Sequence, residues 1–305
     1  MKAFGYQRNG EADVQEYLEL GKPTPLPGEL LVEVRAAGVN PVDWKRRSGA
    51  YGATDPSDFP VVLGREVSGV VREVGKDVDG FAPGDEVFGA VAPGSGAFSE
   101  FTLTTADSTA TKPPQVSFTD AATLTVAAAT AYDGVRQLGL EPGKTLLING
   151  ISGGVGVAAA QLARDNGNNV VGTAGADKKE LVESLGATLV PYGEGVAESV
   201  RAILPDGVDA ILDLAGGEGL RAVVELLADR SRLVSAGDPK TAVELGGQAI
   251  ERDRSRSGLD AVAALVADGK LDPHVEDVVP LDKAADAMAA VEMGHAKGKV
   301  VIQVS

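Results

Sequence analysis

The first part of the chain, to about residue 117, carries short hydrophobic runs of the kind that form β-strands. Residues 30–34 (Leu-Leu-Val-Glu-Val) and 67–71 (Val-Ser-Gly-Val-Val) alternate with polar residues or are rich in β-branched side chains, and turn residues such as Pro-Gly-Asp at 83–85 separate such runs. Short strands with frequent turns are typical of small barrels and sandwiches. We therefore predict a compact β-rich domain here.

From about residue 119 the hydrophobic spacing changes to that of alternating strands and helices. The apolar run 146–148 fits a buried parallel strand, and the helical spacing over 155–164 follows a cluster of glycines. Further segments continue this alternation, namely a strand at 170–171, a helix over 178–185 that ends at Gly186, and strands at 188–191, 208–212 and 232–235. The pattern predicts an α/β architecture with a doubly wound parallel sheet.

The C-terminal part does not extend this alternation. Residues 281–293 have the spacing of a helix and residues 299–304 that of a closing strand. We expect this tail to return to the first domain. The predicted division is therefore 1–118 with 273–305 as the first domain, and 119–272 as the second.

Composition narrows the possible partners. The chain has 28 Lys and Arg against 44 Asp and Glu, a formal net charge of −16, so its surface would repel nucleic acid and anionic membranes. It has no cysteine and only two histidines, which excludes disulfides, iron–sulfur clusters, thiolate zinc sites and multi-histidine metal sites. No run approaches the roughly 18 apolar residues of a membrane helix. We expect a cytoplasmic protein that acts on a small molecule.

The segment after the strand at 146–148 carries the most informative motif. Glycines at 150, 153 and 156 lie between a predicted strand and a predicted helix. A dinucleotide site needs glycines there for a tight turn, for close approach of the pyrophosphate and for close helix–strand packing. The helix N-terminus would also offer free N–H groups to the phosphates. The motif predicts dinucleotide binding, although its first spacing is one residue longer than the usual one.

The same residues fit a second pattern. Gly150-Ile-Ser-Gly-Gly154 is also the Gly-x-Ser-x-Gly elbow of α/β-hydrolases, with Ser152 as nucleophile and His274 or His295 as a later base. An elbow serine normally follows several strands of its sheet, whereas Ser152 follows the first one. The elbow also leaves Gly156 unexplained. A hydrolase is therefore the weaker alternative.

The end of the next strand bears on the choice of nucleotide. NAD sites usually have an acidic residue about 20 positions after the glycine turn, where it holds the ribose hydroxyls. This chain has Thr173 there, and Lys178 and Lys179 follow shortly after. A missing carboxylate and nearby ammonium groups favour a 2′-phosphate, and so NADPH.

Several motifs in order make the chain resemble a known family. They include Gly38-Val-Asn-Pro-Val-Asp43, Leu63-Gly-Arg-Glu-Val-Ser-Gly69, Pro83-Gly-Asp-Glu-Val-Phe-Gly89, the glycine turn and Gly294-His-Ala-Lys-Gly-Lys-Val-Val301. Together they resemble the medium-chain dehydrogenase/reductase superfamily, in its zinc-free quinone oxidoreductase (ζ-crystallin-like) branch. The resemblance implies a GroES-like β-rich catalytic domain, a Rossmann dinucleotide-binding domain, and a substrate cleft between them.

The resemblance also implies that no metal is bound. In the similar zinc alcohol dehydrogenases a cysteine ligand stands where this chain has Asn40, and a histidine ligand where it has Arg65. The hydroxyl residue that relays the alcohol proton is replaced by Val42. Without these groups the zinc route of alcohol oxidation is not available. We expect Arg65 to be a structural ion-pair partner, and Asp43 and Glu66 to be framework carboxylates.

The residues that would hold NADP(H) follow from the same resemblance. Asn40 should face the nicotinamide, with Thr130 nearby. The glycine turn should bind the pyrophosphate through Ser152, Gly153, Gly154 and Val155. The adenosine ribose should be bordered by Thr173, Lys178 and Tyr192. The nucleotide trough should be lined by Ala215 and Ala236.

Tyr51 matches a tyrosine at the mouth of the substrate cleft in these relatives. It is the candidate for orienting the substrate or donating a proton, together with Asn40 as the second catalytic candidate. A phenol is a poor acid at neutral pH, so Tyr51 can equally be a positioning group or a plain part of the cleft wall, with water as the proton donor.

These expectations combine into one leading hypothesis. It is an NADPH-dependent oxidoreductase that transfers hydride, without zinc, to a quinone or an α,β-unsaturated carbonyl compound. A non-catalytic protein that senses NADPH is the alternative. The β-prone segment 241–250 could pair across a two-fold axis, as the sheet edge does in similar proteins, so a homodimer is expected.

Overall fold

The computed structural model describes residues 1–294 and 296–304, and its chain forms two compact units. The first unit comprises Met1–Val126, Arg254–Ala267 and Val275–Ser305, and the second comprises Ala127–Asp253 and Asp268–His274. The first boundary thus falls later than the predicted 118/119. The segment 254–267, which the sequence assigned to the second domain, groups with the first because its helix packs against a strand there.

The first unit is built on two sheets. A three-stranded sheet has the order β2-β1-β4, and a six-stranded sheet has the order β14-β15-β3-β5-β6-β7. The strands are β1 (Lys2–Tyr6), β2 (Gln15–Glu19), β3 (Glu29–Val39), β4 (Val61–Val62), β5 (Glu66–Val74), β6 (Glu86–Val91), β7 (Phe101–Thr111), β14 (Val275–Pro280) and β15 (Lys299–Gln303). Because β3 also pairs with β7, the strands β3, β5, β6 and β7 close on themselves. This confirms the predicted β-rich barrel.

Closure of the barrel depends on the long strand β3. Its register against β5 shifts twice, between Leu31 and Val32 and between Val34 and Ala36, and such bulges bend a strand. Leu30, Val32 and Val34 are buried in the same hydrophobic cluster as side chains of β5 and β6. The alternating pattern of the sequence therefore marks the inner face of the barrel.

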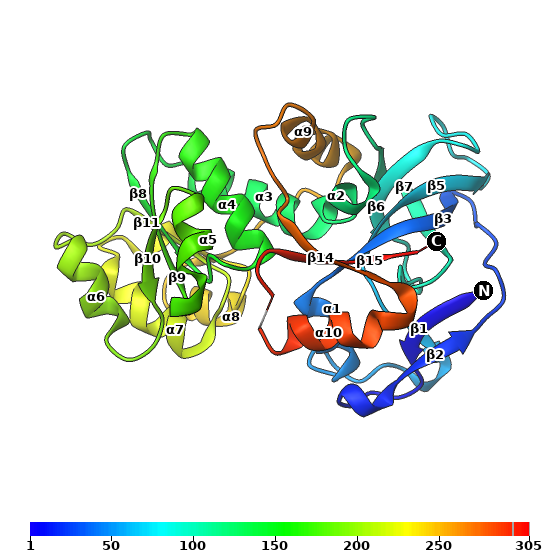
Figure 1. The fold of residues 1–305 in the computed structure, drawn as a ribbon, viewed down its shortest axis with the longest axis horizontal. Helices are drawn as coiled ribbons and strands as arrows, with labels where there is room; N and C mark the ends of the chain where they lie inside the picture. Colours follow the sequence, from blue (N-terminus) through cyan, green and yellow to red (C-terminus); the bar gives the residue numbers. More distant parts are fainter. Residues whose placement is uncertain (295, 305) are drawn as a thin grey trace. The chain divides into compact units, whose positions relative to one another are not determined.

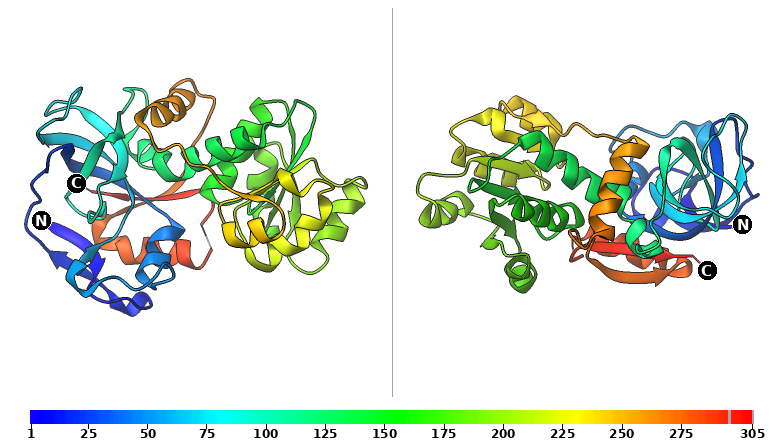
Figure 2. Two further views of the ribbon diagram at one scale, coloured as in Figure 1. Left: turned by 180° about the vertical axis from the view of Figure 1, so that it is seen from behind. Right: turned by 90° about the horizontal axis from the view of Figure 1, so that it is seen from above.

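The C-terminal segment returns to this unit, as predicted. Strand β15, at the red end of the chain in Figure 2, pairs antiparallel with β3. In this register Val301 lies opposite Gly38. Helix α10 (Ala284–Glu292) packs on β15 and buries Ala284 and Met288 in the barrel cluster. The unit also contains α1 (Pro41–Arg47), α2 (Phe118–Ala121) and α9 (Arg256–Ala267), the last packed against β7.

The second unit is a six-stranded parallel sheet in the order β10-β9-β8-β11-β12-β13 (Figure 1). Its strands are β8 (Thr145–Asn149), β9 (Asn169–Ala174), β10 (Thr188–Pro191), β11 (Ala210–Asp213), β12 (Leu233–Ser235) and β13 (Gln248–Ala249). Its helices are α3 (Ala129–Leu138), α4 (Gly154–Asp165), α5 (Lys179–Ser184), α6 (Val196–Ile203), α7 (Gly217–Val223) and α8 (Pro239–Glu244). The chain runs outward from β8 in both directions. Ligands of such sheets bind where the strand order reverses, here at the carboxyl ends of β8 and β11.

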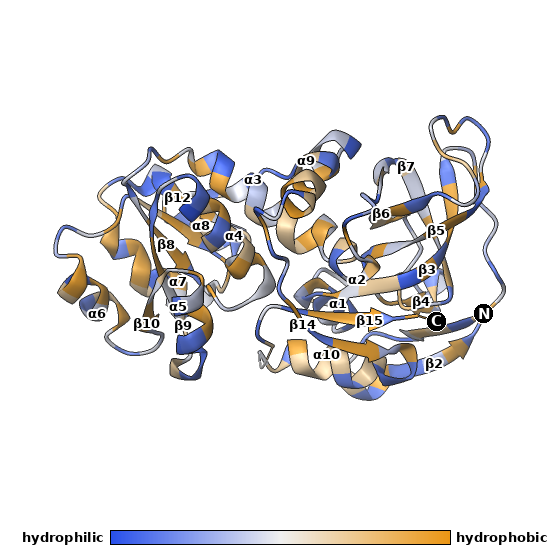
Figure 3. Ribbon diagram, turned by 45° about the horizontal axis from the view of Figure 1, so that its top comes forward, coloured by the Kyte–Doolittle hydropathy of each residue, from blue (hydrophilic) through white to orange (hydrophobic). Residues whose placement is uncertain are grey.

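The inner strands of this sheet are buried on both faces. Leu146, Leu147 and Ile148 of β8 are at most 1% exposed, and Ile211 and Leu212 of β11 are fully buried. In Figure 3 the strands of this sheet are mainly orange, as continuous hydrophobic runs require. This confirms the predicted doubly wound sheet. Among the helices of the described residues, none is long and apolar enough to cross a membrane.

Candidate functional site

The glycine turn connects β8 to α4, and its three glycines have different reasons to be there. Gly150 has φ +94°, in the left-handed region that favours glycine. A Cβ on Gly156 would lie 2.5 Å from the carbonyl oxygens of Gly150 and Ile151, so this position needs glycine for close packing of the helix on the strand. A Cβ on Gly153 would meet no atom closer than 3.8 Å. The space beside Gly153 is thus open to a ligand.

The N-terminus of α4 is built as an anion site. Gly153 is its N-cap, with extended backbone and no side-chain hydrogen bond to the first turn, and no acidic residue stands in that turn. The side chains of Ser152 and Val155 are partly exposed. The first-turn N–H groups and the positive end of the helix dipole are therefore available to a phosphate.

A buried polar network supports the turn from below. The Gly150 N–H donates to Thr173 Oγ1 at 3.1 Å, and the Thr173 hydroxyl donates to Asn149 Oδ1 at 2.6 Å. Asn149 Nδ2 in turn donates to Asp213 Oδ1 at 2.7 Å. Thr173 is only 2% exposed, so its hydroxyl is used inside the protein, beneath the turn.

Asp213 extends this network to the neighbouring strands. Its Oδ1 also accepts from the Gly216 N–H at 2.9 Å, and its Oδ2 accepts from the Ser235 hydroxyl at 2.6 Å. The loops after β11 and β12 are fixed in this way, and they present Ala215 and Ala236 as exposed residues. The carboxyl ends of β8, β11 and β12 therefore form one ordered edge with small residues along it.

The ends of β9 and β10 carry the other predicted nucleotide contacts. Lys178 is buried, and its ammonium lies 3.4 Å from the Asp177 carboxylate. Tyr192 is 69% exposed, and its backbone N–H donates to the Ala174 carbonyl at 3.1 Å. Thr130 lies near the start of α3 and is 5% exposed. All of these belong to the second unit.

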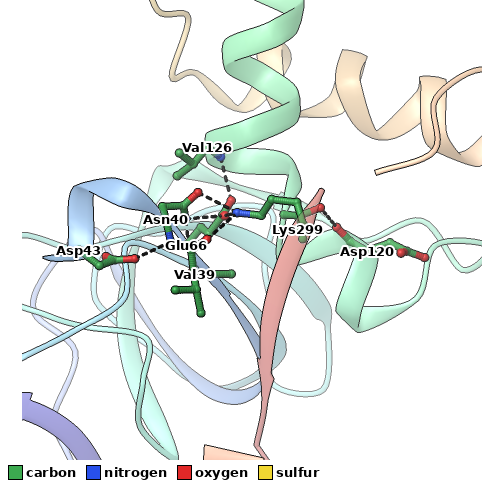
Figure 4. Close-up of polar contacts among 9 residues, drawn as sticks. Val39, Asn40, Asp43, Glu66, Asp120, Val126 and Lys299 are labelled. Atoms are coloured by element: carbon green, nitrogen blue, oxygen red, sulfur yellow. Dashed lines mark hydrogen bonds and ion pairs between the residues drawn. The ribbon is translucent and has the colours of Figure 1, made fainter. Parts of the chain in front are cut away.

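Asn40 of the first unit lies where β3 passes into α1. It is the N-cap of α1, and its backbone N–H donates to Asp43 Oδ2 at 2.9 Å (Figure 4). Its side-chain Nδ2 donates to Glu66 Oε1 at 2.7 Å, and its Oδ1 accepts from Lys299 Nζ at 2.7 Å. Lys299 also lies 3.0 Å from Glu66 Oε1. The four side chains are at most 4% exposed.

Sequence reasoning missed Lys299. Its position in Ala296-Lys-Gly-Lys299 near the end of the chain gives no periodic signal of burial, and its partner Glu66 is 233 residues away. Only the pairing of β15 with β3 brings the two together. A lysine at the start of a strand that pairs beside a polar motif is the one signal that could have indicated it.

Two charged groups near Asn40 have unusual surroundings, and one of them, Arg65, differs from expectation. Burial raises the pKa of the Asp43 carboxyl to about 7, and among the described residues no donor reaches its Oδ1. Arg65, expected to be an ion-pair partner, has no carboxylate within 4.0 Å in the described part of the chain. Burial lowers the pKa of its guanidinium, and the positive charge of Arg46 lowers it further. The ion pair at this place is instead Lys299–Glu66.

Tyr51 lies in the loop after α1 and is 66% exposed. Its hydroxyl has no hydrogen bond to any described residue. The side chain is therefore free to meet a ligand, but the protein itself does not hold it in one position.

The hydrolase alternative gains no support from His274. The His274 N–H donates to Asp272, and the Asp272 carbonyl accepts from Gln161, two turns along α4. Gln161 lies roughly 10 Å along the helix axis from Gly154, the first residue of α4, so the segment of His274 is anchored too far from Ser152 for a nucleophile–base pair. The other candidate base, His295, lies outside the described residues.

The donor groups do not gather in a metal-binding arrangement. In residues 1–294 and 296–304, no three His, Cys, Asp or Glu side chains are grouped so that they could hold a metal ion. The open, uncapped turn at Gly153, by contrast, fits the diphosphate of a dinucleotide.

Comparison with known proteins agrees with both units. A family model described as "Alcohol dehydrogenase GroES-like domain" matches residues 26–114, and one described as "Zinc-binding dehydrogenase" matches residues 185–302. A mitochondrial NAD(P)H oxidoreductase from Homo sapiens is 37% identical over 91% of this chain and 82% of its own length. A 2-methylene-furan-3-one reductase from Solanum lycopersicum is 36% identical over 99% of this chain and 79% of its own.

Solved structures show the same architecture. The quinone oxidoreductase of Escherichia coli, solved with NADPH, has a TM-score of 0.89 at 26% identity and covers 99% of this chain and 100% of its own. The quinone oxidoreductase of Coxiella burnetii has a TM-score of 0.90 at 27% identity, covering 100% and 99%.

A GroES-like barrel joined to a Rossmann sheet with an open glycine turn defines a nicotinamide-dependent oxidoreductase. The chain belongs to the medium-chain dehydrogenase/reductase superfamily, in its quinone oxidoreductase branch. It is accordingly an enzyme that uses NAD(P)H.

Proposed function

We propose that this enzyme transfers hydride from NADPH to a quinone or an α,β-unsaturated carbonyl compound, without zinc. Bound NADPH supplies the hydride, and the acceptor takes this hydride together with one proton from water or from Tyr51. The observation that supports this proposal most directly is the N-terminus of α4, which has no side-chain cap and lies beside the unfilled space at Gly153. It stands at the point where the strand order of the sheet reverses. Relatives named as quinone and enone-type reductases support the acceptor class.

Each predicted residue has a role in this proposal. The glycine turn binds the diphosphate through Ser152, Gly153, Gly154 and Val155. The Gly153 N–H also donates to the Gly150 carbonyl at 3.4 Å, so Gly153 contributes chiefly the open space beside its Cα. The adenosine half is bordered by Thr173, Lys178, Tyr192, Ala215 and Ala236. Asn40 and Thr130 contact the nicotinamide, and Tyr51 orients the acceptor.

The preference for NADPH rests on the end of β9. No carboxylate stands there to hold the ribose hydroxyls, because Thr173 occupies that position and uses its hydroxyl beneath the turn. Lys178, paired with Asp177 on one side, supplies a positive charge nearby. Two similar solved structures are described as NADPH complexes, which supports the same choice.

Zinc independence rests on the donor set around Asn40. Asn40 Oδ1 and Glu66 Oε1 both accept hydrogen bonds from the Lys299 ammonium. A divalent cation on these oxygens would have to displace that charge or bear its repulsion. The groups that could ligate a metal are thus already used by a resident cation.

The test is a screen of the purified protein with NADPH against quinones and enones. We expect NADPH oxidation with at least one of these acceptors, slower oxidation of NADH, and rates unchanged by a metal chelator. NADPH binding without turnover on any acceptor would contradict a catalytic role and would favour a protein that senses the cofactor.

We also propose that the enzyme is a homodimer. Strand β13 ends the parallel sheet, and its residues Gln248 and Ala249 are exposed. A second copy that pairs with its outer edge displaces the Gln137 side chain, which donates to the Ala249 carbonyl at 3.0 Å and accepts from the Glu251 N–H at 2.9 Å. Light scattering should give twice the mass of one chain, and a monomer at working concentration would contradict this.

A further inference from the structure

The strongest unassigned feature is the ion pair of Lys299 and Glu66 against the Asn40 side chain (Figure 4). Lys299 Nζ donates to Asn40 Oδ1 at 2.7 Å, to Glu66 Oε1 at 3.0 Å and to the Val39 carbonyl at 3.0 Å. An ammonium has three N–H donors, so all of them are used. Lys299 therefore has no proton left to offer a substrate, and it acts only through its neighbours.

Both carboxylate oxygens of Glu66 also accept hydrogen bonds. It is completely buried, its Oε1 accepts from Asn40 and Lys299, and its Oε2 accepts from the Val126 N–H at 2.8 Å. A Cβ on Gly38 would lie 2.3 Å from Oε1, so the glycine makes room for the carboxylate. The backbone is thus shaped to hold this charge against Asn40.

Together the two charges determine the orientation of the Asn40 amide. Lysine can only donate and a carboxylate can only accept, so Oδ1 must face Lys299 and Nδ2 must face Glu66. A flipped amide would bring its oxygen against the carboxylate and its NH₂ against the ammonium. Such contacts are costly in a buried site.

The fixed amide has one hydrogen-bonding function left. Nδ2 gives its protons to Glu66 Oε1 at 2.7 Å and to the Gly38 carbonyl at 3.3 Å. With respect to the described residues, one lone pair on Oδ1 remains without a donor. A ligand group that binds Asn40 must therefore be a donor, such as the NH₂ of a carboxamide.

We propose that Lys299 and Glu66 are positioning residues that lock Asn40 as a hydrogen-bond acceptor for the carboxamide NH₂ of the nicotinamide. The proposal rests on the proposed function, because Asn40 is assigned there to the nicotinamide. A misoriented amide would leave NADPH bound through its diphosphate while the nicotinamide loses one of its contacts.

A double-mutant cycle tests this proposal. Replacing both charges in Glu66→Gln/Lys299→Met should lower kcat about tenfold at saturating NADPH, with the NADPH Kd changed less than about threefold. In an Asn40→Ala background the same double replacement should change kcat less than about twofold, because Asn40 carries its effect. Equal losses in both backgrounds would overturn the proposal and leave the pair a purely structural one.

The control is a second ion pair of this unit whose lysine is buried. Lys112 is 5% exposed, and its ammonium lies 2.9 Å from Glu86, whose side chain is 48% exposed. Glu86→Gln/Lys112→Met should lower the thermal unfolding midpoint to a similar degree without lowering kcat. A similar fall of kcat in this control would mean that the loss comes from general destabilisation.

An NMR measurement that does not depend on enzymatic activity separates this proposal from the proposed function. In the ¹⁵N-labelled protein, the Asn40 side-chain NH₂, assigned by its loss in Asn40→Ala, should show two inequivalent protons that exchange slowly with water. In Glu66→Gln/Lys299→Met this protection should be lost. Unchanged protection would overturn the lock, whereas a protected amide in a protein without any reductase activity would contradict only the proposed function.

Discussion

At the residue scale, the glycine turn after β8 depends on glycines, and the cluster around Asn40 depends on buried polar side chains. Gly150 and Gly156 are needed by the fold itself, whereas the space beside Gly153 is left for a ligand. Thr173 and Asn40 are both buried and hydrogen-bonded, but the Thr173 hydroxyl is used beneath the turn, whereas Asn40 Oδ1 keeps a lone pair for a ligand. The sequence shows which residue types are present, but it does not show whether a hydroxyl or amide points inward.

The contrast between two glycines gives a direct prediction. Gly156→Ala should lower the free energy of unfolding by about 1–3 kcal/mol, because its Cβ would overlap backbone oxygens. Gly153→Ala should leave stability within about 0.5 kcal/mol but weaken NADPH binding about tenfold, since the methyl group would stand where the pyrophosphate approaches. Urea unfolding and nucleotide fluorescence titration measure the two effects. Tight NADPH binding by Gly153→Ala would contradict the placement of the diphosphate.

Asp43 predicts a pH dependence of stability. Burial raises the pKa of its carboxyl to about 7, so the folded state binds a proton that the unfolded state releases near pH 4. Stability is therefore fully retained below about pH 4 and lost as pH rises through about 7, by up to about 4 kcal/mol. Asp43→Asn removes this loss and keeps an acceptor for the Asn40 N–H. Urea unfolding of both proteins from pH 5 to 8 should give diverging stabilities, whereas parallel profiles would contradict the assignment.

At the element scale, the ends of strands matter more than their middles. Strands β8, β9, β11 and β12 end in side chains that bond to one another, which makes the carboxyl edge of the sheet one rigid support for the glycine turn. Hydrophobic runs predicted these strands because buried parallel strands are apolar throughout. The polar network was not predictable, since it depends on which strands become neighbours.

Replacing Thr173 tests whether this polar network supports the glycine turn. Thr173→Val keeps the shape of the side chain but removes the donor to Asn149 Oδ1 and leaves the Gly150 N–H with its bond to the Thr173 carbonyl alone. We therefore expect a loss of about 1–3 kcal/mol in unfolding free energy. NADPH should bind more weakly as the turn loosens. Thr109→Val is the matched control, because Thr109 is a fully buried threonine whose hydroxyl donates to the Thr105 carbonyl in the first unit. Thr109→Val should lower the free energy of unfolding without weakening NADPH binding. Equal affinity losses in both variants would contradict a specific support.

At the scale of the whole molecule, the C-terminal return is the feature that completes the first unit. Strand β15 brings Lys299 to Glu66 across 233 residues, and helix α10 closes the barrel core. The return was predicted because the C-terminal segment breaks the alternation of strands and helices, whereas the membership of α9 was not predicted. An amphipathic helix shows that one face is buried, but its sequence does not say which neighbour covers that face.

In the proposed reaction, hydride passes from the nicotinamide to the acceptor without a metal. The most direct measurement uses NADPH that carries deuterium at the transferable C4 position, an enone acceptor that the screen identifies, and buffer with a metal chelator. We expect a reduced product with one deuterium at the β-carbon and a turnover rate that the chelator does not change. A product without deuterium, or turnover that stops with the chelator and returns with zinc, would contradict it.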